Sequence, residues 1–249
     1  MSPRYALVTG AGGGIGAATA LALAAEGYSL WITYATSEAG AHVIGDQCSL
    51  AGAPEVHVTR LDLRDPQSIS DLAANVSGVW GQLHVLVNNG AVCHYRPFEE
   101  IGIDEWDATL ETNARGTFFL SRAVLPLLRA ADGDRVIVNV ASIAGQIGSV
   151  TTGMHYAASK GAILAITRSF ARALASEGIR VNAITPGPVA SPITDKLDSS
   201  ARESLAGAVP LSRFGTPPEV AWIIASVASP KASFVTGATY DVNGGVRID

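Results

Sequence analysis

Tyr156 and Lys160 stand four residues apart at the start of a helix-like segment, Tyr156–Ser176. Positions i and i+4 share one face of a helix, so the phenol and the ammonium point the same way. A tyrosine has a pKa of about 10 and is a poor base near neutrality. A nearby cation favours the phenolate and lowers that pKa toward the range of acid–base catalysis. The pair predicts proton transfer, although the same spacing often arises by chance.

Two further polar residues strengthen the prediction. Ser142 follows the apolar run Arg135–Val140, where its hydroxyl can donate to a carbonyl oxygen on which charge builds. Asn113 is a polar residue in a stretch of small and apolar residues. Its alternative role is an amide that caps or satisfies a break in a helix.

Short apolar runs alternate with longer helix-like segments along the whole chain. This alternation predicts a single α/β domain over residues 1–249, with a doubly wound parallel sheet of the Rossmann type, about seven strands, and helices on both faces. The expected strands are Tyr5–Thr9, Ser29–Tyr34, Glu55–Leu61, Leu83–Asn88, Arg135–Val140, Arg180–Ile184 and Thr239–Val242. The expected helices are Gly16–Glu26, Ala39–Leu50, Pro66–Val79, Asp104–Arg129, Tyr156–Ser176 and Pro218–Ala228.

The residues with special chemistry follow the apolar runs directly. In an open parallel sheet, ligands bind beyond the carboxyl ends of the strands, so this placement predicts one shared site. The residues at these strand ends are Thr9-Gly10, Asp62, Asn88-Asn89-Gly90, Ser142 and Pro186-Gly187.

Four glycines shape the turn after the first strand, at positions 10, 12, 13 and 14, and Gly16 opens the following helix. Glycines let a backbone turn tightly and approach a pyrophosphate, while the helix N-terminus offers free N–H groups and a positive dipole end. The turn therefore predicts a dinucleotide site. The alternative is a glycine-rich connection without a ligand.

Composition excludes several classes of protein. The chain has a net charge of −5, 48% hydrophobic residues and no run rich in Lys or Arg, so nucleic acid and anionic membranes are poor partners. Cys48 and Cys93 fit neither a disulfide framework nor a zinc site, and the five histidines show no ligand spacing for a metal. No signal peptide and no membrane-spanning stretch is recognisable. We expect a soluble, cytoplasmic protein.

Together these residues resemble the short-chain dehydrogenase/reductase family in its single-domain form, over essentially the whole chain, including the T-G-x-x-x-G-x-G turn. The resemblance implies hydride transfer between NAD(P) and a carbonyl or alcohol carbon. It implies a catalytic tetrad of Asn113, Ser142, Tyr156 and Lys160. In this family Ser142 would orient the carbonyl and Tyr156 would pass the proton. Lys160 would hold the nicotinamide ribose and lower the Tyr156 pKa, and Asn113 would hold a water of the relay.

The resemblance also implies the cofactor contacts, which we expect at Gly10, Gly14, Ile15, Gly16, Thr36, Ser37, Asp62, Leu63, Asn89, Gly90, Tyr156, Lys160, Pro186, Gly187, Val189 and Ser191. Two departures stand out: Gly90-Ala91 reverses the family's Ala-Gly order, and Ser191 replaces a threonine. The segments 209–215 and 241–245 resemble the 3-oxoacyl-carrier-protein reductase-like branch. A homotetramer or homodimer is implied too, with Phe118, Leu125, Ile166 and Phe170 facing either a symmetry mate or the sheet.

The residues at the end of the second strand indicate whether the cofactor carries a 2′-phosphate, that is, whether it is NADP or NAD. Dedicated NAD sites place a carboxylate there, which repels a 2′-phosphate. Here Thr36 and Ser37 follow the strand, and Glu38 falls too late. No Lys or Arg occurs between Arg4 and Arg60, and Gly13 stands where NADP-using relatives often carry a basic residue. The acid-free, hydroxyl-rich segment favours NADP, with NAD as the alternative.

The substrate is expected to be a small-molecule carbonyl or alcohol of small to medium size and apolar character. The substrate loop should lie between Ser191 and Ala208, with Ile143, Gln146, His94 and His155 near the pocket mouth. A carrier-bound 3-oxoacyl substrate is the alternative; it needs a basic docking patch, for which Arg129 and Arg172 are candidates. A nucleotide-sensing regulator without turnover and a methyltransferase are the rivals from other classes.

Overall fold

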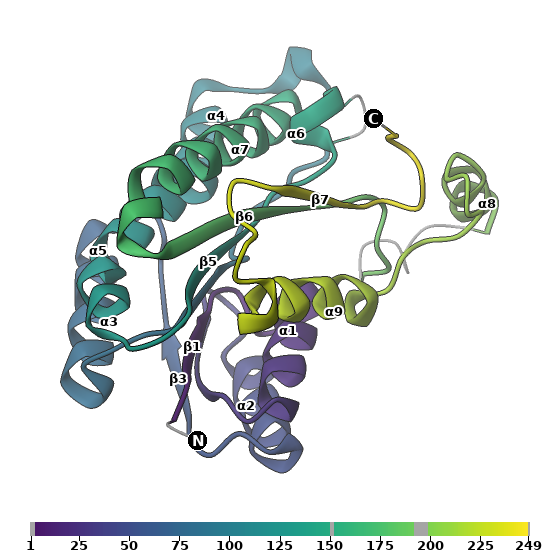
Figure 1. Ribbon diagram of the computed structural model, residues 1–249. Coiled ribbons are helices and arrows are strands. Elements are labelled where there is room, and N and C mark those ends of the chain that lie inside the picture. The colour runs from purple at the N-terminus through teal and green to yellow at the C-terminus, as the bar shows by residue number, and fades with distance from the viewer. Residues whose placement is uncertain (1–2, 150–151, 192–198, 249) are drawn as a thin grey trace.

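A computed structural model describes residues 3–149, 152–191 and 199–248, and it contains one seven-stranded parallel sheet in the order β3-β2-β1-β4-β5-β6-β7 (Figure 1). The predicted fold class is thereby confirmed. The strands are β1 (Tyr5–Val8), β2 (Ser29–Tyr34), β3 (Val56–Arg60), β4 (Val85–Asn88), β5 (Arg135–Val140), β6 (Ile179–Pro186) and β7 (Thr239–Val242).

Helices cover both faces of the sheet (Figure 1). One face packs against α1 (Gly14–Ala25), α2 (Glu38–Ala51) and α9 (Pro217–Ala228). The other face packs against α3 (Pro66–Trp80), α5 (Gly116–Ala130) and α7 (Met154–Leu174). The remaining elements are α4 (Ile103–Leu110), α6 (Ala144–Ile147), α8 (Ser199–Gly207), η1 (Phe98–Glu100), η2 (Glu111–Arg115), η3 (Ala175–Glu177) and η5 (Pro230–Ala232).

The apolar runs in the middle of the sheet become strands because both of their faces are buried. In β4 every residue is buried, and successive side chains enter different cores: Val85 and Val87 pack on the α1 side, and Leu86 packs on the α3 side. Burial of one such side chain contributes about 1.5–3 kcal/mol. This is why continuous apolar runs, rather than alternating ones, mark the strands in the sequence.

The order of the strands creates the crevice that positions the site. β1 pairs with β2 on one side and with β4 on the other, so the chain leaves β1 in opposite directions at this point. Ligand-binding crevices form at such a switch point, outside the carboxyl ends of the strands. Thr9, which follows β1, donates its N–H to Val87 O at 3.0 Å and thereby places the glycine turn beside the end of β4.

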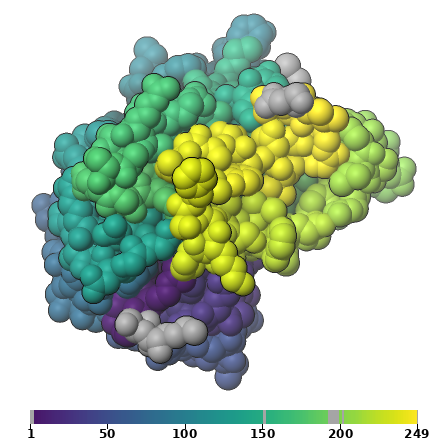
Figure 2. Space-filling view, viewed as in Figure 1, coloured from purple at the N-terminus to yellow at the C-terminus, as the bar shows by residue number. Residues whose placement is uncertain are grey.

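Two helical features differ from the sequence prediction. The expected helix Asp104–Arg129 is divided into α4 and α5 by a π-helical turn, η2, so one extra residue is accommodated at Asn113. Helices α6 and α8 were not predicted, because one has only four residues and the other is polar. In Figures 1 and 2, α8 projects from the edge of the molecule. Among the described helices, none is long and apolar enough to cross a membrane.

Candidate active site

The glycine turn between β1 and α1 is held by close backbone contacts. Gly10 and Gly14 have φ angles of +65° and +56°. A Cβ on Gly16 would lie 2.3 Å from Gly10 O and 2.5 Å from Asn89 Nδ2, so no side chain fits there. Gly13 and Gly14, in contrast, face open space, with nothing within 4 Å of an added Cβ. This open cradle at the N-terminus of α1 fits a pyrophosphate.

The segment after β4 braces this turn. Asn89 Nδ2 donates to Thr9 O at 2.9 Å and to Gly10 O at 3.1 Å, so this predicted cofactor residue directs its amide at the turn itself. The N–H groups of Asn89 and Gly90 both donate to Thr9 Oγ1. A Cβ at Gly90 would lie 3.1 Å from Leu63 Cδ1, so the Gly-Ala order relieves a tight contact at this point.

The predicted adenosine side lies at the ends of β2 and β3. Thr36 and Ser37 are exposed, and Ser37 precedes α2 as its N-cap residue. A Cβ on Gly40 would lie 2.7 Å from Gly12 O, so the β2–α2 connection rests on the glycine turn. Asp62 Oδ1 accepts the N–H of Arg64 at 2.9 Å. Ser37 thus lies against the glycine turn, while the Asp62 carboxylate caps the segment after β3.

Near the ends of β2 and β3, the structure shows the surroundings of two charged residues, Glu38 and Arg60, which the sequence alone did not define. The Glu38 carboxylate accepts a hydrogen bond from the Tyr34 phenol, which raises the pKa of that phenol. Arg60 is exposed at the end of β3 and is the register partner of Tyr34. The strand pairing, which the sequence does not display, therefore places a cation one strand away from Thr36.

Ser142, Tyr156 and Lys160 come together at the carboxyl ends of β5 and β6. Ser142 lies within hydrogen-bonding reach of Tyr156, and this contact acts to lower the pKa of the phenol. Lys160 Nζ lies 5.6 Å from the centre of the Tyr156 ring. The predicted grouping of serine, tyrosine and lysine is therefore present in the fold.

Desolvation is the largest influence on the pKa values of Tyr156 and Lys160. Burial raises the pKa of its phenol well above the usual value, and this effect outweighs the hydrogen bond from Ser142. Burial also lowers the pKa of Lys160 to about 8. Lys160 Nζ donates to Val140 O at 2.8 Å, so the ammonium is held by a strand carbonyl. Desolvation is the largest influence on the Tyr156 phenol, so a lowering of its pKa by Lys160 stays a prediction.

Asn113 lies in the π-helical turn η2 and is fully buried. Its Oδ1 accepts the N–H of Val92 at 2.8 Å, and its Nδ2 donates to Val92 O and to Ser159 Oγ. These bonds join η2, the segment after β4 and helix α7. Among the described residues, the side chain bonds only to groups outside its own helix and lies beside the helix that carries Tyr156, so it does not cap the break in the helix.

The segment after β6 is fixed on two sides. Gly187 N donates to Val242 O at 3.0 Å, and Pro186 O accepts the N–H of Ile143 at 3.1 Å. A Cβ on Gly187 would lie 2.7 Å from Asn243 Cα, which explains the glycine. Val189 forms an isolated bridge with Gly215. Ser191 ends this described stretch, and residues 192–198 of the predicted substrate loop lie outside the described residues.

The residues expected at the pocket mouth lie in different surroundings. Gln146 lies in α6 beside Ser142, but His155 is fully buried, with Nε2 3.4 Å from Glu105 Oε1 and its ring stacked on His94. His155 was expected at the mouth, and this is wrong because α4 covers it. Sequence reasoning missed Cys93, which lies close enough to Tyr156 and Lys160 to influence the titration of both. Its position just after β4 was the available signal.

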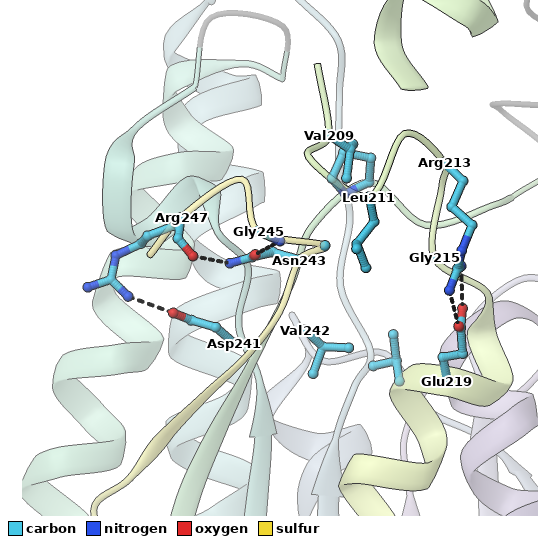
Figure 3. Close-up of a pocket in the computed structure, with 13 residues that line it drawn as sticks. Val209, Leu211, Arg213, Gly215, Glu219, Asp241, Val242, Asn243, Gly245 and Arg247 are labelled. Atoms are coloured by element: carbon cyan, nitrogen blue, oxygen red, sulfur yellow. Dashed lines mark hydrogen bonds and ion pairs between the residues drawn. The ribbon is translucent and has the colours of Figure 1, made fainter. Parts of the chain in front are cut away.

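A cavity of about 420 Å³ borders the segment after β6, next to Pro188. Its apolar walls include Val209, Leu211 and Val242, and the ion pairs Arg213–Glu219 and Asp241–Arg247 flank it (Figure 3). Within the described residues, no three His, Cys, Asp or Glu side chains form a group that could hold a metal ion.

A glycine cradle at the switch point of a parallel sheet, beside a clustered serine, tyrosine and lysine, defines a dinucleotide-dependent oxidoreductase. Comparison with known proteins agrees. A family model described as enoyl-(acyl carrier protein) reductase matches residues 10–247. The chain belongs to the short-chain dehydrogenase/reductase family and is an NAD(P)-dependent oxidoreductase acting on a CH–OH or carbonyl group.

The chain is similar over its full length to proteins named 3-oxoacyl-[acyl-carrier-protein] reductase. It is 36% identical over 244 residues to FabG of Staphylococcus aureus, with 98% of each chain covered. It is 35% identical over 246 residues to FabG of Thermotoga maritima, again with 98% of each covered. The protein from Synechocystis is 33% identical over 247 residues, which cover 99% of this chain and 98% of that one.

Proposed function

We propose that this protein is an NADPH-dependent carbonyl reductase in which Ser142, Tyr156 and Lys160 act directly on the reaction and Asn113 supports them. The observation that carries this proposal is the meeting of Ser142 with Tyr156 in front of Lys160, at the same sheet edge as the open glycine cradle. The cradle has room for a pyrophosphate at Gly13 and Gly14, so the residues present fit a dinucleotide.

The roles follow from the chemistry of each group. The bound nicotinamide supplies or accepts the hydride. Ser142 donates a hydrogen bond to the carbonyl oxygen and so orients it. Tyr156 gives its phenol proton to that oxygen as negative charge develops, and its raised pKa keeps the proton in place at neutral pH. Lys160 provides a buried positive charge beside the phenol.

Asn113 is proposed to act through position rather than by contact with the substrate. Its side chain fixes Val92 after β4 and Ser159 in α7, and Ser159 Oγ in turn donates to Tyr156 O at 2.7 Å. A water held at η2, as the family resemblance implies, would extend the proton path from Lys160.

The preference for NADP is supported by the β2 end. Thr36 and Ser37 offer hydroxyls, Glu38 is engaged by Tyr34, and Arg60 adds a cation one strand away. The remaining predicted contacts, Gly10, Ile15, Gly16, Asp62, Leu63, Asn89, Gly90, Pro186, Gly187, Val189 and Ser191, are proposed to shape or line this same groove. A side-by-side assay with NADPH and NADH tests the preference; a higher kcat/KM with NADH overturns it.

A small to medium apolar ketone is the proposed substrate. Large apolar side chains are exposed near the site, with Tyr95 57%, Ile147 57% and Met154 49% exposed. The alternative substrate is a carrier-bound 3-oxoacyl group, and the similar proteins that are named 3-oxoacyl-[acyl-carrier-protein] reductase support it. Against it, Arg129 is paired with Glu177 through two hydrogen bonds of 2.6 Å and 2.9 Å, which neutralises one of the two expected docking cations.

The test is NADPH consumption with a panel of simple ketones, a 3-oxoacyl thioester of a small thiol, and the same acyl group on a carrier protein. Comparable kcat/KM for the two thioesters supports the small-molecule proposal. A preference of about 10²-fold or more for the carrier-bound form, lost in Arg172→Ala, establishes the alternative. No turnover of any carbonyl overturns both.

A homotetramer or homodimer is proposed for the assembly. Of the four apolar residues expected on outer helix faces, Leu125 is part of the core, and Phe118 and Phe170 stack on each other with ring centres 5.4 Å apart. Ile103 in α4 and Phe119 in α5 remain 79% and 36% exposed. Light scattering after gel filtration gives the oligomeric state directly, and a monomer contradicts the proposal.

A further inference from the structure

Asp241 is a hub of contacts that the proposed chemistry does not use. It lies in β7, the edge strand, and its carboxylate engages side chains from three other segments. Oδ1 accepts hydrogen bonds from Gln146 Nε2, at 2.9 Å, and from Thr185 Oγ1. Oδ2 pairs with Arg247 Nη1 at 2.7 Å (Figure 3). The carboxylate therefore joins β7 and β6 to helix α6 and to the C-terminal segment.

Helix α6 connects this hub to the catalytic serine. It begins two residues after Ser142, whose Oγ accepts the N–H of Ala144 at 3.1 Å and whose backbone oxygen accepts the N–H of Gly145 at 3.0 Å. A Cβ on Gly145 would lie 2.5 Å from the backbone carbon of Lys160. Helix α6 thus contacts Ser142 at its start and packs closely against α7, which carries Tyr156 and Lys160.

A helix of four residues is not stable by itself, because nucleation of a single turn is unfavourable in water. Its position depends on contacts with the rest of the molecule. On one side it rests on Lys160 through Gly145, and on the other side Gln146 binds Asp241. The bond to Asp241 is charge-assisted, and such bonds are about twice as strong as neutral ones.

The charge of Asp241 also determines which way the Gln146 amide points. Gln146 Oε1 is buried and has no hydrogen-bond partner within the described part of the chain. No hydrogen bond to the amide oxygen therefore fixes the orientation of this side chain. The reverse orientation would place that oxygen against the carboxylate. The side chain of Asp241 is 26% exposed and that of Arg247 is 23% exposed, so water screens this group of charges only in part.

We propose that Asp241 is a positioning residue for the reaction: through Gln146 it holds α6, and thereby Ser142, at the correct place opposite Tyr156. The inference deepens the proposed function and rests on it for its effect on turnover. The structural part of the proposal is that the bond between Gln146 and Asp241, here called the tether, holds α6 against β7. This part is independent of any substrate.

Asp241→Ala, Gln146→Ala and the double variant are compared with the wild-type protein, and Asp46→Ala on the exposed side of α2 is the control. Each single change at the tether should lower kcat for ketone reduction about tenfold, less than the ~10²-fold loss that a 1 Å misplacement can cause. KM for NADPH should change little. The double variant should be no slower than Asp241→Ala, since both single changes break the same contact between Gln146 and Asp241. Asp241→Asn, which keeps an oxygen acceptor, should recover most of the rate.

Hydrogen exchange of the amides at 145–148, all of which are hydrogen-bonded in the structure, is the second measurement. It should become faster in Asp241→Ala and Gln146→Ala and stay unchanged in Asp46→Ala. Unchanged exchange, or losses in kcat that multiply in the double variant, overturns the proposal. If the wild-type protein reduces no carbonyl at all, the proposed function fails instead, and the exchange data alone decide on the tether.

Discussion

Lys160 is buried and Tyr156 is half-buried, and desolvation is the largest influence on the pKa of each. The phenol keeps its proton to high pH, whereas the ammonium of Lys160 has a pKa of about 8. A neutral phenol is a proton donor, so the resting protein is prepared for reduction of a carbonyl rather than for oxidation of an alcohol. The reverse reaction needs the phenolate, which burial disfavours.

For Tyr156→Phe we expect near-normal cofactor binding and a loss of kcat by about 10² or more, because the donor is removed while the ring remains. Nicotinamide fluorescence measures the binding, and steady-state assays measure kcat. Ser159→Ala, which alters a residue on the same helix without removing the phenol, is a comparison that should cost far less. Full activity of the phenylalanine variant would show that Tyr156 is not the acid.

The pH–rate profiles of the two directions should differ. Since burial raises the Tyr156 pKa, ketone reduction should be flat through neutral pH, and alcohol oxidation should still be rising at about pH 10. Profiles of kcat in both directions check this. A plateau of oxidation near neutrality would mean that Lys160 lowers the phenol pKa in the working enzyme, as the sequence predicts.

Lys160 should also leave a signature in stability. Its folded pKa is about 8 and its ordinary value 10.5, so the unfolded chain binds more protons between these pH values and stability rises with pH across this window. Below about pH 8 the buried charge is a constant cost. The difference in unfolding free energy between wild type and Lys160→Met should therefore grow in favour of wild type from about pH 8 to about pH 10.5. Urea unfolding at several pH values measures it, and a flat difference contradicts the prediction.

At the scale of elements, the β1–α1 turn and the segment after β4 form one rigid unit. Gly16 lies against Gly10, and Asn89 closes the turn from the other side. Farther back, Asn88 Nδ2 donates to Asn139 Oδ1 and Asn139 Nδ2 to Thr167 Oγ1, which links β4, β5 and α7 by buried amides. The cradle and the catalytic helix are thus tied to the same strands.

Gly16→Ala and Gly13→Ala form a matched pair. The first places a Cβ 2.3 Å from a carbonyl oxygen, and the second meets nothing within 4 Å at an extended φ of 172°. We expect Gly16→Ala to lose cofactor binding and Gly13→Ala to keep it. Gly13→Arg should lower KM for NADPH, and not for NADH, by about tenfold, as expected for a charge placed near a phosphate. Equal behaviour of the two alanine variants would contradict the geometry.

At the scale of the whole molecule, Arg180 joins parts of the chain that are distant in sequence. It is 5% exposed and pairs with Asp134 through bonds of 2.9 Å and 2.7 Å. It also donates to the carbonyl oxygens of Val227, Ser229 and Val235. The amino end of β6 is thereby fastened to β5 and to the connection between α9 and β7.

Arg180→Met should destabilise the protein by about 3–5 kcal/mol, since it leaves Asp134 buried without its partner and frees three carbonyl groups. Arg129→Gln, which breaks the exposed pair with Glu177, should cost about 0–1 kcal/mol. Thermal and urea unfolding of both variants measure this. Equal losses would show that burial does not separate the two ion pairs.

Local sequence patterns determined most of the framework. The bounds predicted for β2 and β5 agree with the structure, because apolar runs without breaks mark strands buried on both faces. The bounds of the half-buried edge strand β7 agree as well. The catalytic candidates stand at strand ends, and parallel strands bring such ends to one edge. The branch of the family was accessible from the same motifs.

Only the tertiary structure decided the rest. The π-helical turn at Asn113, the desolvation that raises the pKa of Tyr156, and the bond from Gln146 to Asp241, 95 positions away, have no local signal. Desolvation and long-range hydrogen bonds depend on what packs around a group. Spacing along the chain determined which groups are available, and packing determined their protonation and their position.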